Sequence, residues 1–235
     1  MTKYRSNIIL LIDRRSVHIK DGDEKMRVVK EHDERKQEII DTANRLFSKK
    51  GYSQCSINDI LNEIGIAKGT FYHYFRSKED VLDAVIGSIT REVMVKVNSV
   101  ASNEKLRAEE KLLGVFLSMR IEEVENDDFL EDIHKVENAL MHQKSLASMV
   151  KMLTPVLTEI VLEGITEGVF RCKYPKQYIE IFLASSLTLL DGGIFEVDEK
   201  KYTMTLMALI SLLEKMLEVE DGAFTCRANE YICGK

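Results

Sequence analysis

Apolar residues recur at helical spacing along most of the chain. In residues 34–52 they lie three and four positions apart, which predicts an amphipathic helix. Its apolar positions are Ile39, Ile40, Ala43, Leu46 and Phe47. Two lysines and Gly51 supply a cationic last turn and a C-cap, so we expect the helix to end there.

Two short helical stretches follow in quick succession. Ser56 is a natural N-cap for the first, and Asp59 could complete a weaker form of the capping box. Gly65 ends this helix, only two residues separate it from the next stretch (68–75), and Ser77 then caps a longer helix. A packing helix followed by two short helices and a tight glycine turn predicts a helix-turn-helix.

Beyond residue 84 the pattern predicts helices only. Residues 145–170 read as one long apolar helix, bent or interrupted before Pro155. Residues 178–195 and 202–219 are apolar over more than one face, which predicts packing against both their own core and a second subunit. The predicted interface residues are Leu187, Ile194, Leu206, Leu209, Ile210 and Leu213.

The expected fold is therefore all-α, with about nine helices. A helix-turn-helix domain (34–80) precedes a larger helical effector-binding and dimerisation domain (81–235). Residues 1–33 form an N-terminal extension that is either disordered or partly non-native. Met26 could be the true start, because the four residues before it back-translate to a purine run resembling a ribosome-binding sequence.

The net charge differs between these regions of the chain. The net charge of −6 divides into +2 for residues 1–33, +2 for residues 34–79 and −10 for the remainder. This asymmetry suits one module that faces a polyanion and one acidic body.

Several classes of function are disfavoured. The four cysteines show no CxxC pair and no ligand-like spacing with histidine, so we predict that they form no metal site and no disulfide. No cofactor is expected. Metalloprotease, hydrolase and phosphate-loop motifs do not occur in the sequence, and we expect no enzymatic activity. No apolar run approaches the roughly 20 residues that span a bilayer, which favours a cytoplasmic protein.

The segment AKGTFYHYFRSKEDV (residues 67–81) gathers aromatic and cationic side chains. Phe71 and Phe75 share one helical face and should pack on the module's own core. The other face is suited to a DNA major groove and its flanking phosphates. The DNA-binding residues predicted from this geometry are Ser56, Lys68, Gly69, Thr70, Tyr72, His73, Tyr74 and Lys78.

The sequence SINDILNEIGIAKGTFYHYFRSKEDVL (residues 56–82) resembles the DNA-binding signature of the TetR-type (TetR/AcrR) bacterial transcriptional regulators. The resemblance implies that Lys68, Gly69, Thr70, Tyr72, His73 and Lys78 touch operator DNA. It also adds Asn58 to the predicted DNA-binding residues, because some members carry a base-reading residue at that position. It also implies a homodimeric repressor that binds a palindromic operator and is released by a small molecule. A DNA-binding protein controlled by a protein partner, or by no ligand, is the alternative. Ala67 departs from the serine or threonine often found at its position.

The effector region is less clearly marked. Its candidate residues are Met119, His134, Asn138, Met141, His142 and Met149. His134, Asn138 and His142 fall four residues apart, so they could share one helical face. That row could line a pocket, hold a metal with Glu131 or Glu137, or be a solvated face.

Overall fold

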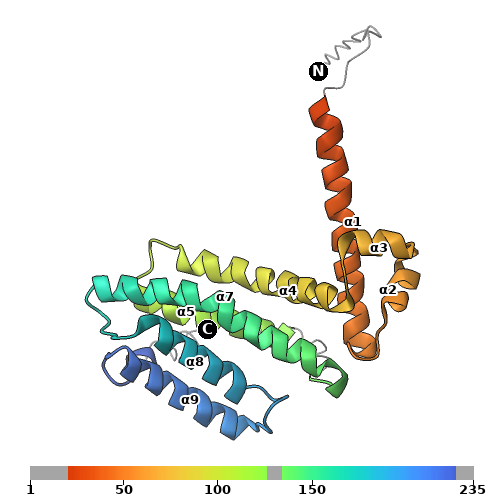
Figure 1. Cartoon of the computed structure of the whole chain (residues 1–235). Coiled ribbons are helices and arrows are strands. Elements are labelled where there is room, and N and C mark those ends of the chain that lie inside the picture. The colour runs from red at the N-terminus through yellow and green to blue at the C-terminus, as the bar shows by residue number, and fades with distance from the viewer. Residues whose placement is uncertain (1–20, 126–133, 226–235) are drawn as a thin grey trace, which may run out of the picture. The chain divides into compact units, whose positions relative to one another are not determined.

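The computed structural model describes residues 21–125 and 134–225, and all regular elements among them are helices (Figure 1). Eight are α-helices and one is a 3-10 helix. The chain divides into two compact units after Gln37. The second unit, which begins at Glu38, contains every element discussed below except the first part of α1. The all-α prediction is confirmed.

A three-helix module occupies residues 38–75. It consists of the C-terminal part of α1 (Asp21–Lys50), followed by α2 (Ile57–Ile64) and α3 (Lys68–Tyr74). Helix α1 begins at Asp21 rather than at residue 34 as expected. Residues 21–33 carry no continuous apolar stripe, so hydrophobic periodicity could not reveal them, although they are rich in good helix formers.

Aromatic and aliphatic side chains from all three helices form the core of this module. Phe71 and Phe75 are 0% and 5% exposed, and they belong to one buried cluster with Ile40, Phe47 and Ile60. The predicted packing of the two phenylalanines is confirmed. Phe71 lies on α3, and Phe75 is the residue that follows its last turn. Their burial on the module core turns the opposite face of α3 to the surface.

The remaining described helices form a helical body. In chain order they are α4 (Lys78–Ala101), α5 (Ala108–Glu125), η1 (Val136–Asn138), α7 (Ala139–Thr166), α8 (Pro175–Leu189) and α9 (Glu199–Met216). Helix α7 packs between α4 and α8, and α9 lies along the far side of α8 (Figure 1).

Pro155 lies inside α7 without interrupting it. Proline removes one backbone donor, yet neighbouring threonines add bonds of their own: Thr154 Oγ1 donates to Val150 O at 2.7 Å, and Thr158 Oγ1 donates to Thr154 O at 2.6 Å. Pro155 is also exposed, so water can reach the carbonyl that its ring leaves unpaired. The prediction that this helix is interrupted before Pro155 is wrong, and the alternative, a bend, stays a prediction.

The stretch Val136–Thr166 is long and apolar enough, by length and composition, to cross a membrane. Its composition has a second explanation within the fold. Leu153, Leu157, Ile160 and Val161 are at most 2% exposed and form the centre of the body's core. We therefore interpret this stretch as a core helix of the body.

Two residues of the predicted dimer interface lie elsewhere than expected. Leu209 and Leu213 are each 5% exposed and belong to the core of their own body. Side chains buried within one subunit have almost no surface left for a partner, so assigning these two leucines to the interface was wrong. Among the other four, Ile194 is 42% exposed, and Leu187, Leu206 and Ile210 are partly exposed.

Candidate nucleic-acid interface

The outward face of α3 carries the predicted contact residues. Lys68, Gly69, Thr70, Tyr72 and His73 are all exposed, Tyr72 by 45%. The Lys68 ammonium lies 5.8 Å from the centre of the Tyr72 ring, so the cation lies over the face of this ring. A Cβ atom built on Gly69 would meet nothing within 4 Å, which leaves room for a close approach to the backbone. These five residues form a continuous surface that can accept a polyanion.

The turn before α3 follows from its sequence. Gly65 adopts φ 78°, in the left-handed region that favours glycine, and its N–H donates to Leu61 O. Ala67 is the N-cap of α3, and alanine has no side-chain acceptor for the first N–H groups. The turn therefore stops α2 and redirects the chain within two residues.

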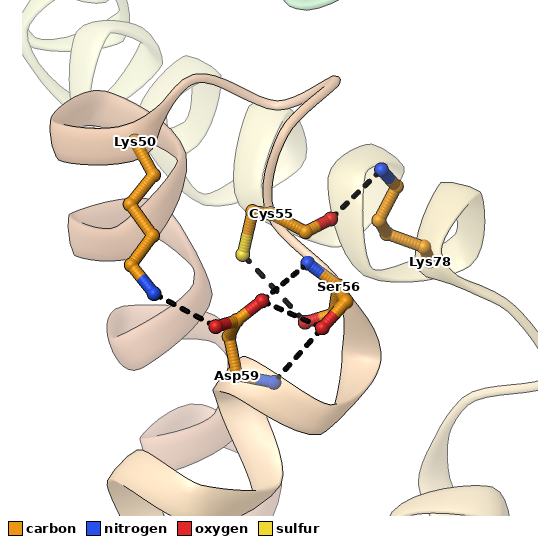
Figure 2. Close-up of polar contacts among 5 residues, drawn as sticks. All are labelled: Lys50, Cys55, Ser56, Asp59 and Lys78. Carbon is orange, nitrogen blue, oxygen red and sulfur yellow. Dashed lines mark hydrogen bonds and ion pairs between the residues drawn. The ribbon is translucent and has the colours of Figure 1, made fainter.

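The carboxylate of Asp59 caps the start of α2 together with Ser56 (Figure 2). The Ser56 N–H donates to Asp59 Oδ2 at 2.8 Å, the Ser56 hydroxyl lies 2.6 Å from the same oxygen, and the Asp59 N–H donates to Ser56 Oγ at 3.2 Å. The predicted capping box is confirmed in its complete form. Because the Asp59 carboxylate already accepts from the Ser56 N–H and hydroxyl, the main role of Ser56 is to cap α2. A phosphate would have to displace the carboxylate to reach these donors.

Two ion pairs join α1 to α2. Lys50 Nζ lies 2.7 Å from Asp59 Oδ1, and Arg45 Nη1 lies 2.6 Å from Glu63 Oε1. The hydrogen bonds from Lys50 and Ser56 lower the pKa of Asp59 far below its usual range, and the Arg45 hydrogen bond lowers the pKa of Glu63. These pairs are exposed and contribute little stability, but they turn two cations of α1 towards α2.

Lys78 has a role within the fold that its sequence position did not reveal. Its ammonium donates to Tyr52 O at 2.8 Å and Cys55 O at 2.9 Å, and it lies 4.3 Å from the centre of the Tyr52 ring. Figure 2 shows the Cys55 contact. An ammonium has three donors, so one remains for a phosphate. Lys78 thus ties the α1–α2 loop to the start of α4.

The other two candidates on this module differ in exposure. Asn58 is exposed on the first turn of α2. Tyr74 is half-buried against the module core, with its ring centre 5.1 Å from that of His73. Tyr74 is therefore a supporting residue in the fold, and it presents less surface to a ligand than Tyr72 does.

Two predicted effector residues instead contact the three-helix module. Asn138 is fully buried: its Oδ1 accepts from the Tyr52 N–H at 2.6 Å, and its Nδ2 donates to Phe47 O at 3.2 Å. Met141 is 1% exposed and belongs to the core of the module. Neither side chain is available to line an effector pocket, so these two assignments were wrong. The contacts span 86 and 91 residues of sequence, and local periodicity holds no signal for them.

The two histidines of the predicted row come together without Asn138. Their ring centres are 5.0 Å apart, and both rings contact Asp191 just after α8. Of the suggested co-ligands, Glu137 is exposed and Glu131 lies outside the described residues. Met149 packs on the body core, and the side chain of Met119 is not among those described. Asp191 is the residue that sequence reasoning missed.

Comparisons with known proteins indicate a single protein family. The family described as "Bacterial regulatory proteins, tetR family" matches residues 39–85, and "Tetracyclin repressor-like, C-terminal domain" matches residues 121–212. The chain is 51% identical over 49 residues to the HTH-type transcriptional regulator YerO of Bacillus subtilis, which is 21% of this chain and 17% of that protein. It is 29% identical over 135 residues to the fatty acid metabolism regulator protein of the same organism, covering 56% of this chain and 68% of that one.

Solved structures agree on the fold. A TetR-family transcriptional regulator from Syntrophomonas wolfei aligns with a TM-score of 0.58 at 24% identity, covering 77% of this chain and 95% of that one. RolR in complex with resorcinol aligns with a TM-score of 0.60 at 18% identity, covering 83% and 93%. Both family matches fall on the module and the body described above. The chain belongs to the TetR family of bacterial regulatory proteins and is a DNA-binding transcriptional regulator.

Proposed function

We propose that this regulator is a repressor that binds a palindromic operator as a homodimer and is released by a small molecule. One observation carries the proposal: the core of the module holds Phe71 and Phe75, and this leaves the polar face of α3 exposed for DNA. A recognition helix presented in this way fits the major groove. We also propose that the protein acts in the cytoplasm, where its operator would lie.

Dimerisation is supported by apolar side chains that α8 and α9 leave uncovered. The exposed set comprises Ile181 (54%), Leu189 (42%), Met204 (64%), Met207 (45%) and Leu212 (42%). Methionine and aliphatic side chains gathered on adjoining helices are typical of a surface that associates. Two copies of the three-helix module could then contact two half-sites on DNA.

The dimer is tested by replacing Met204 and Met207 together with glutamate. We expect sedimentation to show a monomer, because four charges would be buried at the symmetric contact. The control is Val95→Glu, which charges an apolar residue of α4 that is 71% exposed. An unchanged dimer in the double variant would remove α9 from the interface.

DNA binding is tested with a duplex that carries the protected sequence from a genomic footprint. Replacing Lys68 with alanine should weaken binding and reduce the slope of log affinity against log salt by about 1, as expected for one lost phosphate contact. Lys200→Ala, which removes an exposed cation of α9, is the matched control. A Lys68→Ala protein with unchanged affinity and salt slope would contradict the assignment of α3.

Two similar proteins suggest the chemical class of the effector. The fatty acid metabolism regulator is named for its pathway, and RolR is described with resorcinol bound. For this chain we propose an organic effector bound by the body. The genes beside the mapped operator give the compounds to test, and release of the duplex by one of them is the expected result.

A further inference from the structure

Three metal-ligating side chains from three separate elements converge on one point of the body. His134 lies in the turn before η1, His142 lies in the first turn of α7, and Asp191 follows α8. His142 Nε2 is 2.7 Å from Asp191 Oδ2, and His134 Nε2 is 3.3 Å from Asp191 Oδ1. One ligand atom from each residue lies within 4.8 Å of the others.

This donor set fits a particular class of ion. Two imidazole nitrogens and a carboxylate oxygen are a common ligand set for zinc, with the fourth position open to water or another ligand. Tetrahedral ligands at zinc bond lengths are about 3.4 Å from one another. The two histidine–carboxylate separations are 2.7 and 3.3 Å, and no two of the three ligand atoms are more than 4.8 Å apart. Small side-chain rotations would therefore place all three atoms around one ion.

The surroundings hold these side chains in place. The exposed fractions of the His134, His142 and Asp191 side chains are 28%, 13% and 11%. The Gly193 N–H donates to Asp191 Oδ1 at 2.8 Å, which orients the carboxylate. A Cβ atom at Gly193 would lie 2.4 Å from His134 Cδ2, so only glycine lets the ring approach the loop this closely.

The same segment is connected to the three-helix module. Asn138 lies four residues from each histidine and binds Tyr52 N–H and Phe47 O. Beside it, Glu137 O accepts from the Ser53 N–H at 2.9 Å. An ion that fixes the histidines would thereby fix the segment that contacts the α1–α2 loop.

We propose that His134, His142 and Asp191 form a binding site for a divalent transition-metal ion of the zinc class, and that its occupancy changes operator affinity through Asn138. The metal site stands on its own geometry, whereas its effect on operator affinity rests on the proposed function. An ion can shift DNA binding only by binding the competent and incompetent states with different affinity.

The site is tested by adding Co²⁺ to chelator-treated full-length protein. We expect one ion per chain, the visible d–d absorption of a four-coordinate ion, and its loss when Zn²⁺ is added. His142→Ala and Asp191→Asn should each weaken binding at least tenfold. His32→Ala, which removes an exposed histidine of α1, should leave the titration unchanged.

Two further measurements distinguish the possible failures. Gly193→Ala keeps every ligand but displaces the His134 ring, and we expect binding to weaken by about 10- to 100-fold. Circular dichroism of each variant shows whether it is folded. Absence of the four-coordinate spectrum in the folded native protein would overturn the metal site. Operator binding is measured separately, so this result would not contradict the proposed function.

The coupling is measured by operator binding with and without Zn²⁺. We expect the operator affinity of the native protein to change at least fivefold on adding Zn²⁺, and that of His142→Ala to stay constant. Equal affinities for the native protein in both conditions, with the ion bound, would overturn the coupling. Failure of the native protein to bind any operator would instead contradict the proposed function.

Discussion

The starts of α2 and α7 are both polar clusters, but they are assembled in different ways. At α2, Ser56 and Asp59 bond to each other across three residues of sequence. At α7, Asn138 bonds to atoms 86 and 91 residues away, and His142 to an atom 49 residues away. The first cluster caps a helix, whereas the second joins separate parts of the fold.

This difference predicts how each cluster fails. Removing a local cap loosens one helix end, while removing a long-range contact weakens the packing of one element on another. Substitutions at the start of α7 should therefore lower the free energy of unfolding more than substitutions at the start of α2. They should also loosen the three-helix module.

The largest effect is expected at Met141. This α7 side chain is 1% exposed and fills the module core, so Met141→Ala should lower the free energy of unfolding by about 2–5 kcal/mol. Urea denaturation measures the loss. Val95→Ala, at a site 71% exposed on α4, is the control and should change stability little. Equal effects of the two variants would show that Met141 is not part of the module core.

A smaller loss is expected at Asn138. Asn138→Ala leaves the Tyr52 N–H and Phe47 carbonyl without their buried partner, which costs about 1–3 kcal/mol. Hydrogen exchange at the Tyr52 amide should become faster. Gln143→Ala removes an exposed amide from the same helix and serves as the control. Unchanged protection of Tyr52 would mean that this bond does not hold the loop.

The cap of α2 should matter less. Ser56→Ala removes the acceptor for the Asp59 N–H, and the loss of such a cap costs about 1 kcal/mol. Thermal or urea unfolding detects this, with Ser53→Ala in the preceding loop as the comparison. A loss as large as that of Asn138→Ala would contradict the distinction between local and long-range clusters.

The smallest effect depends on pH. Folding lowers the pKa of Asp59 below its unfolded value of about 3.9, so its ionised form stabilises the fold above that pH. The contribution is lost as the pH falls through the folded pKa. The difference in unfolding free energy between native protein and Asp59→Asn should be constant near neutrality and shrink below about pH 4. Glu104→Gln, in the loop after α4, is the control variant. If the difference in unfolding free energy between native protein and Asp59→Asn did not change with pH, folding would not favour the ionised form of Asp59.

Elements with local signals were predicted well. The capping box, the glycine turn and the two faces of α3 each depend on residues within one or two helical turns. Phe71 and Phe75 were placed correctly because one helical period decides which side of α3 is apolar. Five of the residues of α3 predicted to face DNA are exposed, whereas Tyr74 is half-buried against the module core.

Features that depend on more distant packing were missed. Leu209 and Leu213 belong to the body core, although the apolar pattern of α9 suited an interface equally well. Periodicity shows that several faces of a helix are apolar, but it does not show which face meets the same subunit.

By itself, the sequence determined the helical class, the helix-turn-helix and the polar face of α3, because each depends on interactions between near neighbours in the chain. Only the tertiary structure decided that Lys78 ties the loop after α1, that Asn138 and Met141 serve the module, and that Asp191 meets two histidines. These contacts join residues between 23 and 91 positions apart. Such pairs meet only when helices have packed, and packing depends on the whole apolar surface of the chain.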